Sequence, residues 1–181
     1  RIQNHCADAG MGADLAVNYG MFSFSKPYFV LRFVFGLTDY EIGIETFQEF
    51  CPEYERVGCG VLQQQLNLNR EEKLALLQAI DENYRPENRV YRYNYFYDNC
   101  TTRARDIIIR CMSGDVVYGN YNNGGKATFR SLTHIYNVEH PWARFGNDLL
   151  LGVKADMSIK SGQEQFLPLI LSKELDSATV K

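Results

Sequence analysis

The sequence predicts an α+β domain: a small, mostly antiparallel sheet packed on two helices, with additional helices toward the C-terminus. Apolar residues that recur at three- and four-residue spacing predict a helix over residues 70–83. The same spacing predicts a second helix that begins near Asp98-Asn99 and ends before Gly114. Alternation of apolar and polar residues predicts strands at 17–25, 39–46, 57–68 and 90–97.

The composition is that of one globular domain. The chain has 181 residues, of which 45% are hydrophobic and 23% charged, so we take 1–181 as a single domain in which 113–165 could form a lid or insertion. A net charge of −3 with scattered Lys and Arg excludes a nucleic-acid partner. The longest apolar run, 27–36, contains Arg32 and is shorter than the ~20 residues that span a bilayer, so no membrane span is expected.

The N-terminal part is predicted from its glycines and its alternation. Arg1-Ile2-Gln3 resembles the end of a strand, and 7–16 is predicted as a loop or hairpin tip. The strand at 17–25 contains a glycine, which predicts a kink. Ser25 is the expected N-cap of a helix that Gly36 ends.

The middle of the chain carries clear helix signals and one breaker. Pro52 limits 47–56 to a short helical turn or loop. Asn69 followed by Glu72 forms the pattern of a capping box, which fixes the start of the 70–83 helix. Residues 85–88 are predicted as a turn.

The fourth strand and the segments after it complete the prediction. Strand 90–97 presents four tyrosines on one face. The following helix has an apolar stripe at Ala104, Ile107, Ile108 and Cys111. Residues 119–126 are predicted as loop and 128–160 as short elements, of which 147–152 fits strand or helix; 164–180 is predicted as a helix interrupted near Pro168.

Cys100 is the most informative residue, because it follows the tyrosine-rich strand and opens a helix. The unsatisfied N–H groups of a helix start carry roughly half a positive charge. That field favours a thiolate, and the same groups can stabilise an oxyanion. Cys100 is therefore a candidate nucleophile, with a buried structural thiol as the alternative.

The other cysteines have no such setting. Cys111 lies on the apolar helical stripe and is expected to pack in the core. Cys6, Cys51 and Cys59 are expected to be packing or disulfide residues, and Cys51 and Cys59 could pair in an oxidising compartment. The spacing of cysteines and histidines matches no zinc site, and we expect no metal and no cofactor.

A thiol nucleophile usually needs a base, most often histidine. The chain has three: His5, His134 and His140. His5 follows the first strand, whereas the other two lie before Pro141-Trp142; each also fits a surface or capping role.

Several segments together resemble one family, the Lnb N-terminal periplasmic domain family. The most distinctive block is N-C-T-T-R, Asn99 to Arg103. The other segments occur in order along the chain: "NYGMFSF" (18–24), "RFVFGLTDYEI" (32–42), "QQLNLNREEKLAL" (64–76), "YRPENRVYRYNYFYDNCTTRARD" (84–106), "TFRSL" (128–132), "PWARFGNDLLLG" (141–152) and "FLPLIL" (166–171).

The resemblance implies a circularly permuted relative of NlpC-type and papain-like thiol enzymes. It identifies Cys100 with the nucleophile and Asn99, Thr101 and Arg103 with the block that holds it. The family histidine precedes an Arg-Ile step similar to Arg1-Ile2, which would place it upstream of residue 1. His5 would then be a substitute base, and proton transfer would be impaired in this chain.

Three classes of function follow as expectations. The first is a cell-envelope thiol hydrolase or acyltransferase that forms an acyl-thioester from a lipid ester or a peptide amide, since the resemblance links the family's founding member to lipoprotein acyl-chain remodelling. The second is a non-catalytic module that binds a lipid or glycan in an aromatic groove, to which we assign Tyr95, Tyr97 and Tyr19. A purely structural, disulfide-linked domain is a third. The resemblance implies a periplasmic or cell-envelope location after removal of a signal peptide.

Overall fold

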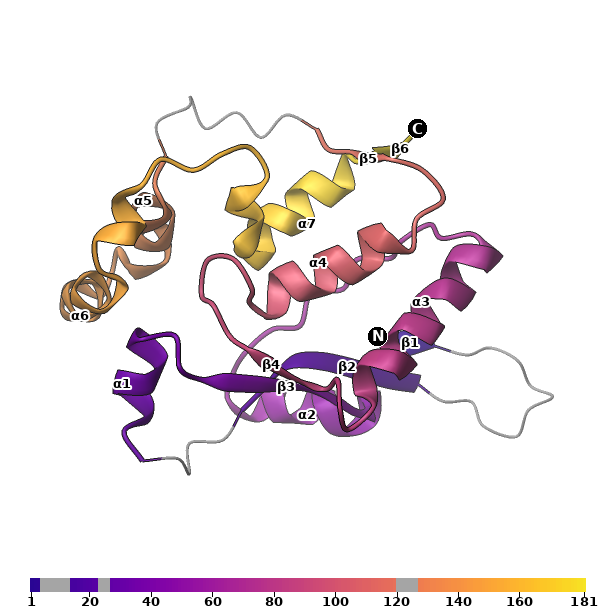
Figure 1. Cartoon of the computed structure of the whole chain (residues 1–181), viewed down its shortest axis with the longest axis horizontal. Coiled ribbons are helices and arrows are strands. Elements are labelled where there is room, and N and C mark those ends of the chain that lie inside the picture. Colours follow the sequence, from indigo (N-terminus) through magenta and orange to yellow (C-terminus); the bar gives the residue numbers. More distant parts are fainter. Residues whose placement is uncertain (4–13, 23–26, 120–126) are drawn as a thin grey trace.

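The computed structural model describes residues 1–3, 14–22, 27–119 and 127–181, and it confirms an α+β fold (Figure 1). In these ranges the α-helices are α1 (Phe29–Val34), α2 (Phe47–Arg56), α3 (Arg70–Tyr84), α4 (Cys100–Arg110), α5 (Phe129–His134), α6 (Pro141–Leu151) and α7 (Pro168–Asp176). Short 3-10 helices are η2 (Ile135–Asn137), η3 (Val153–Asp156) and η4 (Gln163–Phe166). The strands are β1 (Ile2–Gln3), β2 (Asp14–Met21), β3 (Asp39–Thr46), β4 (Val90–Arg92), β5 (Val116–Val117) and β6 (Thr179–Val180).

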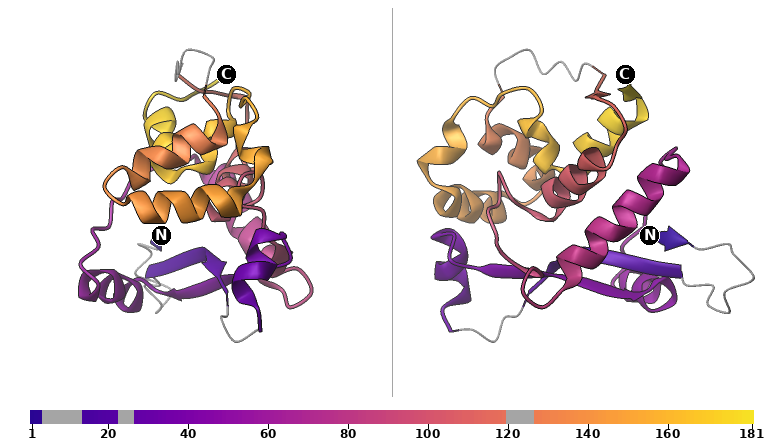
Figure 2. Two further views of the ribbon diagram at one scale, coloured as in Figure 1. Left: turned by 90° about the vertical axis from the view of Figure 1, so that its left-hand side faces the viewer. Right: turned by 45° about the vertical axis from the view of Figure 1, so that its right-hand side comes forward.

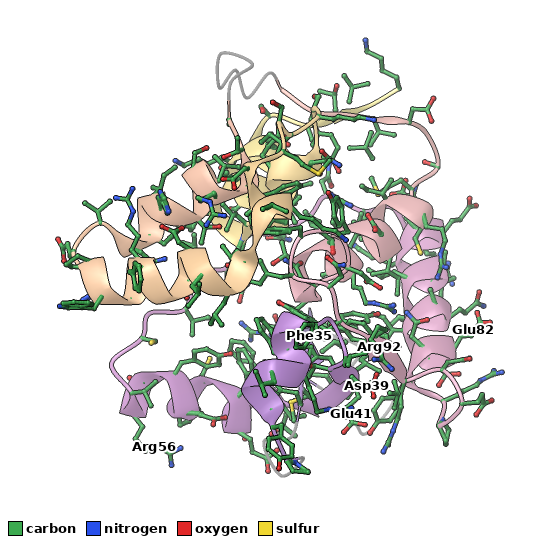
Figure 3. All side chains as sticks on the ribbon, turned by 60° about the vertical axis from the view of Figure 1, so that its left-hand side comes forward. Phe35, Asp39, Glu41, Arg56, Glu82 and Arg92 are labelled. Carbon is green, nitrogen blue, oxygen red and sulfur yellow. The ribbon has the colours of Figure 1, made fainter. Side chains whose placement is uncertain are left out.

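The main sheet is an antiparallel meander in the order β1-β2-β3-β4. The register of β2 against β3 shifts between Asn18 and Met21, so the predicted kink near the glycine is a β-bulge. Between β3 and the edge strand β4, Arg92 Nε lies 2.9 Å from Asp39 Oδ1, and Glu41 lies beside them on β3 (Figure 3). The predicted strand at 39–46 is confirmed as β3.

The helices cover both faces of this sheet. α3 and α4 pack on one face and α2 on the other (Figure 1). The predicted stripe of α4, including Ala104 and Cys111, packs into the core that they form. The buried residues of this first core are Tyr19, Tyr40, Ile42, Ala79, Ile80, Tyr91 and Ile107.

The capping box of α3 is confirmed. Glu72 N donates to Asn69 Oδ1 at 2.9 Å, and Asn69 N donates to Glu72 Oε2 at 2.9 Å. The other oxygen of Glu72 accepts hydrogen bonds from Ser113 Oγ at 2.6 Å and Ser113 N at 2.9 Å. These bonds from Ser113 and then Asn69 lower the pKa of Glu72, and they tie the start of α3 to the turn after α4.

A second core gathers the C-terminal helices. Leu167 separates η4 from α7, which confirms the predicted interruption near Pro168. Residues 147–152, left open between strand and helix, belong to α6 up to Leu151. The buried residues of the second core are Phe96, Phe129, Leu132, Ala155, Phe166, Leu167 and Ile170.

Two predictions about residues 47–68 are wrong. Pro52 does not break the chain into a turn, because α2 runs through it. The capping box of Thr46 and Glu49 fixes the start of α2. Pro52 has no N–H to donate to the carbonyl of Gln48, but Gln48 is exposed, so water can hydrogen-bond to that carbonyl instead. Residues 57–68 form no strand in the described structure.

The 57–68 segment is held by side chains rather than by a backbone ladder. Gln64 Nε2 donates to Ser172 O at 3.1 Å and to Asp176 Oδ1 at 2.5 Å. Arg1 Nη1 donates to Gln63 Oε1 at 2.9 Å. Alternation alone cannot make a strand where no sheet edge is offered as a partner.

The tyrosine-rich strand is shorter than predicted, because β4 ends at Arg92. Asn94 Oδ1 accepts from Phe96 N at 3.2 Å and from Tyr97 N at 3.1 Å, and Asn94 bridges to Asp98. This side chain folds the backbone into a turn and ends the ladder.

Three other predictions concern the first third of the chain and the later loop. Residues 14–16, predicted as loop, belong to β2. The residue that precedes α1 is Tyr28, whose backbone is left-handed with φ 58. The proposed N-cap Ser25 and most of the loop 119–126 lie outside the described residues.

Candidate functional site

Cys100 is the first residue of α4, and its side chain is an exposed free thiol. The sequence starts the helix here because Asn99 has extended backbone angles, φ −106 and ψ 179, and caps it. Thr102 N donates to Asn99 Oδ1 at 2.9 Å, while Asn99 N donates to Thr102 Oγ1 at 2.8 Å. This reciprocal pair is a capping box with threonine in the usual place of glutamate.

The side-chain amide of buried Asn99 also holds two distant parts of the chain together. Its Nδ2 donates to Tyr95 O at 3.0 Å and to Phe166 O at 2.9 Å. Asn99 therefore fixes the start of α4 against both the turn before it and η4 of the second core. An N-cap that only closed the helix would need no such donors.

Arg103 holds the segment that precedes Cys100. Its Nε and Nη2 donate to the two oxygens of Asp98 at 2.7 and 2.8 Å. Its guanidinium carbon lies 3.8 Å above the ring of Tyr91, whose hydroxyl donates to Tyr19 O at 2.5 Å. Arg103 thus links α4 to β4 and, through Tyr91, to β2.

The backbone and side chains around Cys100 leave it accessible. A Cβ placed on Gly20 would lie 3.8 Å from Cys100 Cβ, so the bulge of β2 passes close to the thiol without a side chain there. Tyr40, Tyr91 and Tyr93 lie within electrostatic range of the Cys100 sulfur. Burial raises the pKa of all three phenols and a negative Cys100 raises it further, so they are neutral at physiological pH.

The start of α4 offers unused hydrogen-bond donors beside the thiol. Arg103 N donates to Asn99 O at 3.0 Å, and Thr102 N is used by the capping box. Within the described part of the chain, the N–H groups of Cys100 and Thr101 donate to no protein acceptor. Two uncommitted donors at a helix start, next to an exposed thiol, are able to bind a negatively charged oxygen.

A cavity of about 450 Å³ lies along α4, between this helix, α3 and β2. Asp98 and Arg103, on either side of Cys100 in the sequence, contribute to its wall, although Cys100 itself does not. Its lining residues are Tyr19, Asn83, Tyr97, Asp98, Arg103, Asp106, Ile107 and Arg110.

The predicted groove residues divide between two places. Tyr19 and Tyr97 line the cavity as expected. Tyr95 instead packs against Phe166 in the second core, with ring centroids 5.9 Å apart, and burial raises its pKa. Thr101 is half-buried between Cys100 and Thr102 and, within the described structure, its side chain makes no hydrogen bond.

Neither of the two histidines in the described part of the chain forms a hydrogen bond with Cys100. His134 Nε2 lies 2.6 Å from Asp148 Oδ1, between α5 and α6, and exposed His140 precedes α6. His5 and Cys6 lie outside the described residues. Cys51 and Cys59 are both free thiols, so the pairing considered for them is not formed.

Sequence reasoning missed Thr102, Tyr40 and Tyr93. The first could have been found from Asn99 and Thr102, which are spaced like the capping box at 69–72. Tyr40 and Tyr93 contact each other with ring centroids 4.0 Å apart, and only the pairing of β3 with the end of β4 brings them together. Among the described residues, His, Cys, Asp and Glu form no group of three that could hold a metal ion.

The fold and the site define an α+β domain in which an exposed cysteine opens a helix beside a cavity. The chain belongs to the Lnb N-terminal periplasmic domain family, whose model matches residues 4–133, a range that includes His5 and Cys100. It is therefore a periplasmic domain. No curated protein and no solved structure matches. None of the helices in the described ranges is long and apolar enough to cross a membrane.

Proposed function

We propose that this domain is a cysteine-dependent acyl hydrolase or acyltransferase of the cell envelope, with Cys100 as its nucleophile. The observation that carries the proposal is the start of α4: an exposed thiol next to the uncommitted N–H groups of Cys100 and Thr101. The permuted papain-like arrangement that the family resemblance implies agrees with this proposal, since there too the nucleophile opens a helix. Fold analogy alone would not be sufficient.

In the proposed reaction the Cys100 thiolate sulfur attacks an acyl carbonyl carbon. The carbonyl oxygen becomes an oxyanion that the N–H groups of Cys100 and Thr101 stabilise. The bond from carbon to the ester oxygen or amide nitrogen then breaks, the leaving group takes a proton, and an acyl-thioester remains on Cys100. Water or an amine attacks the thioester and restores the thiolate.

The proton in this reaction requires a base, and His5 is the candidate that the sequence leaves. His134 Nε2 is hydrogen-bonded to Asp148, so we do not assign His134 as the base. The substrate would bind in the cavity along α4. Tyr19, Tyr97 and Ile107 supply apolar surface there, and Arg103 and Arg110 supply positive charge. A lipid ester or a peptide amide remains the proposed substrate class.

A non-catalytic lipid- or glycan-binding module is the second candidate. It is favoured by the absence of a histidine near Cys100 among the described residues, together with the cavity on α4. In that case Asn99, Arg103 and the surrounding tyrosines would hold a binding groove, and Cys100 would be an unreactive surface thiol.

Competitive alkylation separates the two candidates. Cys59 is the matched control, because it is also an exposed free thiol but follows α2 instead of opening a helix. The intact protein is treated with limiting iodoacetamide at neutral pH, and peptide mass spectrometry measures both sites, with Cys100→Ser to confirm the assignment. Faster labelling of Cys100 supports the enzyme, whereas labelling no faster than that of Cys59 excludes it.

A further inference from the structure

The outward face of α6 is apolar. Trp142, Phe145 and Leu149 recur at helical spacing, and Trp142 and Leu149 are 85% and 74% exposed. Val138 before α6 and Val153 after it continue the same spacing and are also exposed. A helix in a water-soluble domain normally turns such a stripe inward, so this face needs an explanation.

The inward side of α6 is held by charges instead. Asp148 Oδ1 lies 2.8 Å from Arg130 Nη1 and 2.6 Å from His134 Nε2, both on α5. Arg130 also donates to Asp156 of η3 at 2.6 Å. These ion pairs fix the orientation of α6, and hydrogen bonds with His134 and then Arg130 lower the pKa of Asp148. The apolar stripe is therefore held outward by the fold.

α1 is apolar on two sides. Its inner face packs toward the cysteine site, because the rings of Phe33 and Tyr93 have centroids 5.8 Å apart and Tyr93 is near Cys100. The other side carries Leu31 and, just past the helix end, Phe35, which is 71% exposed. Figure 3 shows Phe35 at this end of α1.

The two apolar faces lie at the same end of the molecule. Figure 1 and both views of Figure 2 place α1 and α6 at one end, and the N-terminal end of α4, which carries Cys100, points toward it. We name the exposed side chains there the apolar end; it consists of Tyr28, Leu31, Phe35, Trp142, Phe145 and Leu149.

The charge at this end differs from that of the whole chain. The chain carries −3, yet 27–37 contains one basic residue, Arg32, and no acidic one. Segment 138–154, which spans the whole stripe, contains Arg144 and Lys154 and two acidic residues, exposed Glu139 and Asp148, and Asp148 is neutralised by Arg130 on the inner side of α6. Apart from the paired Asp148, three basic residues, Arg32, Arg144 and Lys154, thus stand against one acidic residue beside the apolar end, a balance that complements phosphate groups.

We propose that the apolar end docks on the surface of a phospholipid bilayer, with Trp142 at the level of the headgroups. Aromatic and aliphatic side chains beside Arg and Lys are the composition of helices that lie in a membrane interface, and Trp prefers the boundary between headgroup and acyl chain. A periplasmic domain faces such surfaces. Docking would bring the end of α4 that carries Cys100 toward lipid, but it does not depend on the chemistry of Cys100.

Trp142 is the only tryptophan in the chain, so its fluorescence reports on this one position. The intact protein is titrated with vesicles of phosphatidylethanolamine and phosphatidylglycerol. Emission is expected to shift to shorter wavelength, with binding confirmed by co-sedimentation. Phe145→Asp and Leu149→Asp keep the reporter and should each weaken binding roughly tenfold or more, since each replaces one apolar side chain that the bilayer would bury.

Leu62→Asp is the matched control. Leu62 is 80% exposed but lies between α2 and α3, in a segment whose next two residues bond to Arg1 and to α7 rather than to α1 or α6, so its substitution should leave vesicle binding unchanged. The proposal is overturned if wild-type emission does not move with vesicles, or if Phe145→Asp binds as well as wild type. It is also overturned if the protein ignores vesicles and forms a dimer that Leu149→Asp dissociates, because a second copy would then cover this face.

Discussion

Asn99 is predicted to stabilise the domain far more than a helix cap alone. Loss of a capping side chain typically costs about 1 kcal/mol. The Asn99 amide also donates to the buried carbonyls of Tyr95 and Phe166, and each such bond contributes about 1 kcal/mol net. Asn99→Ala should therefore lower the free energy of unfolding by about 3 kcal/mol, a large fraction of the ~5–15 kcal/mol that stabilises a domain.

Serine separates the two contributions, because it caps a helix as well as asparagine but has no amide to donate. Asn99→Ser should still cost about 2 kcal/mol, the share of the bonds to Tyr95 and Phe166. Asn69, which caps α3 and makes no side-chain donor bond among the described residues, is the control. Asn69→Ser should change stability by only a few tenths of a kcal/mol, and Asn69→Ala by about 1.

Urea unfolding measures all four variants. The expected result is a lower midpoint with an unchanged slope, since the surface exposed on unfolding stays the same. If Asn99→Ser proves as mild as Asn69→Ser, the amide does not join the two cores and the reasoning is refuted. The test also bears on the site, because this amide sets the position of the first turn of α4.

Two further predictions concern access to the thiol and acid stability. Gly20→Ala adds a Cβ 3.1 Å from Asn18 Oδ1, which must shift slightly, and 3.8 Å from Cys100 Cβ, so it should slow alkylation of Cys100. Gly60→Ala adds a Cβ with no atom within 4 Å and should not slow it; equal rates would contradict the packing. The hydrogen bond with His134 lowers the pKa of Asp148 below 3.8. The ionised Asp148 carboxylate therefore stabilises the folded protein above pH 3.8, and this stabilisation is lost as the pH falls through the lower pKa that Asp148 has in the folded state. In Asp148→Asn, the urea midpoint should accordingly fall less steeply below about pH 4. An unchanged slope would show that the pair is not formed.

Local signals in the sequence were sufficient for the helices that position the site. Asn69 with Glu72, and the apolar stripe after Asn99, fix α3 and α4 because caps and periodicity act within a few residues. The strand at 39–46 was equally clear. The candidate nucleophile, too, was visible from its place at a helix start.

The features that could not be predicted from the sequence depend on contacts between distant segments. Residues 57–68 alternate like a strand but meet no free sheet edge, and Gln64 ties them to α7 instead. The tyrosine run stops being a strand where Asn94 bonds its own backbone. Tyr95 turns into a second core whose other members, apart from the adjacent Phe96, come from residues 127–170. Periodicity carries no information about such partners.

The outward stripe of α6 shows a related limit. Helical spacing of Trp142, Phe145 and Leu149 would normally indicate a face packed on a core. The ion pairs of Asp148 with α5 reverse that orientation, and they join residues 14 or more positions apart. A sequence pattern gives the face of a helix but not the direction in which it points.

The most direct test of the central claim is acylation of Cys100. The intact protein is incubated at neutral pH with the p-nitrophenyl ester of a fatty acid, whose leaving group needs no proton from a general acid. Mass spectrometry of the intact chain and of its peptides then locates any thioester. We predict one acyl group on Cys100, lost in Cys100→Ala and retained in Cys59→Ala. No adduct, or acylation of Cys59 as fast as that of Cys100, would contradict a nucleophile at the start of α4.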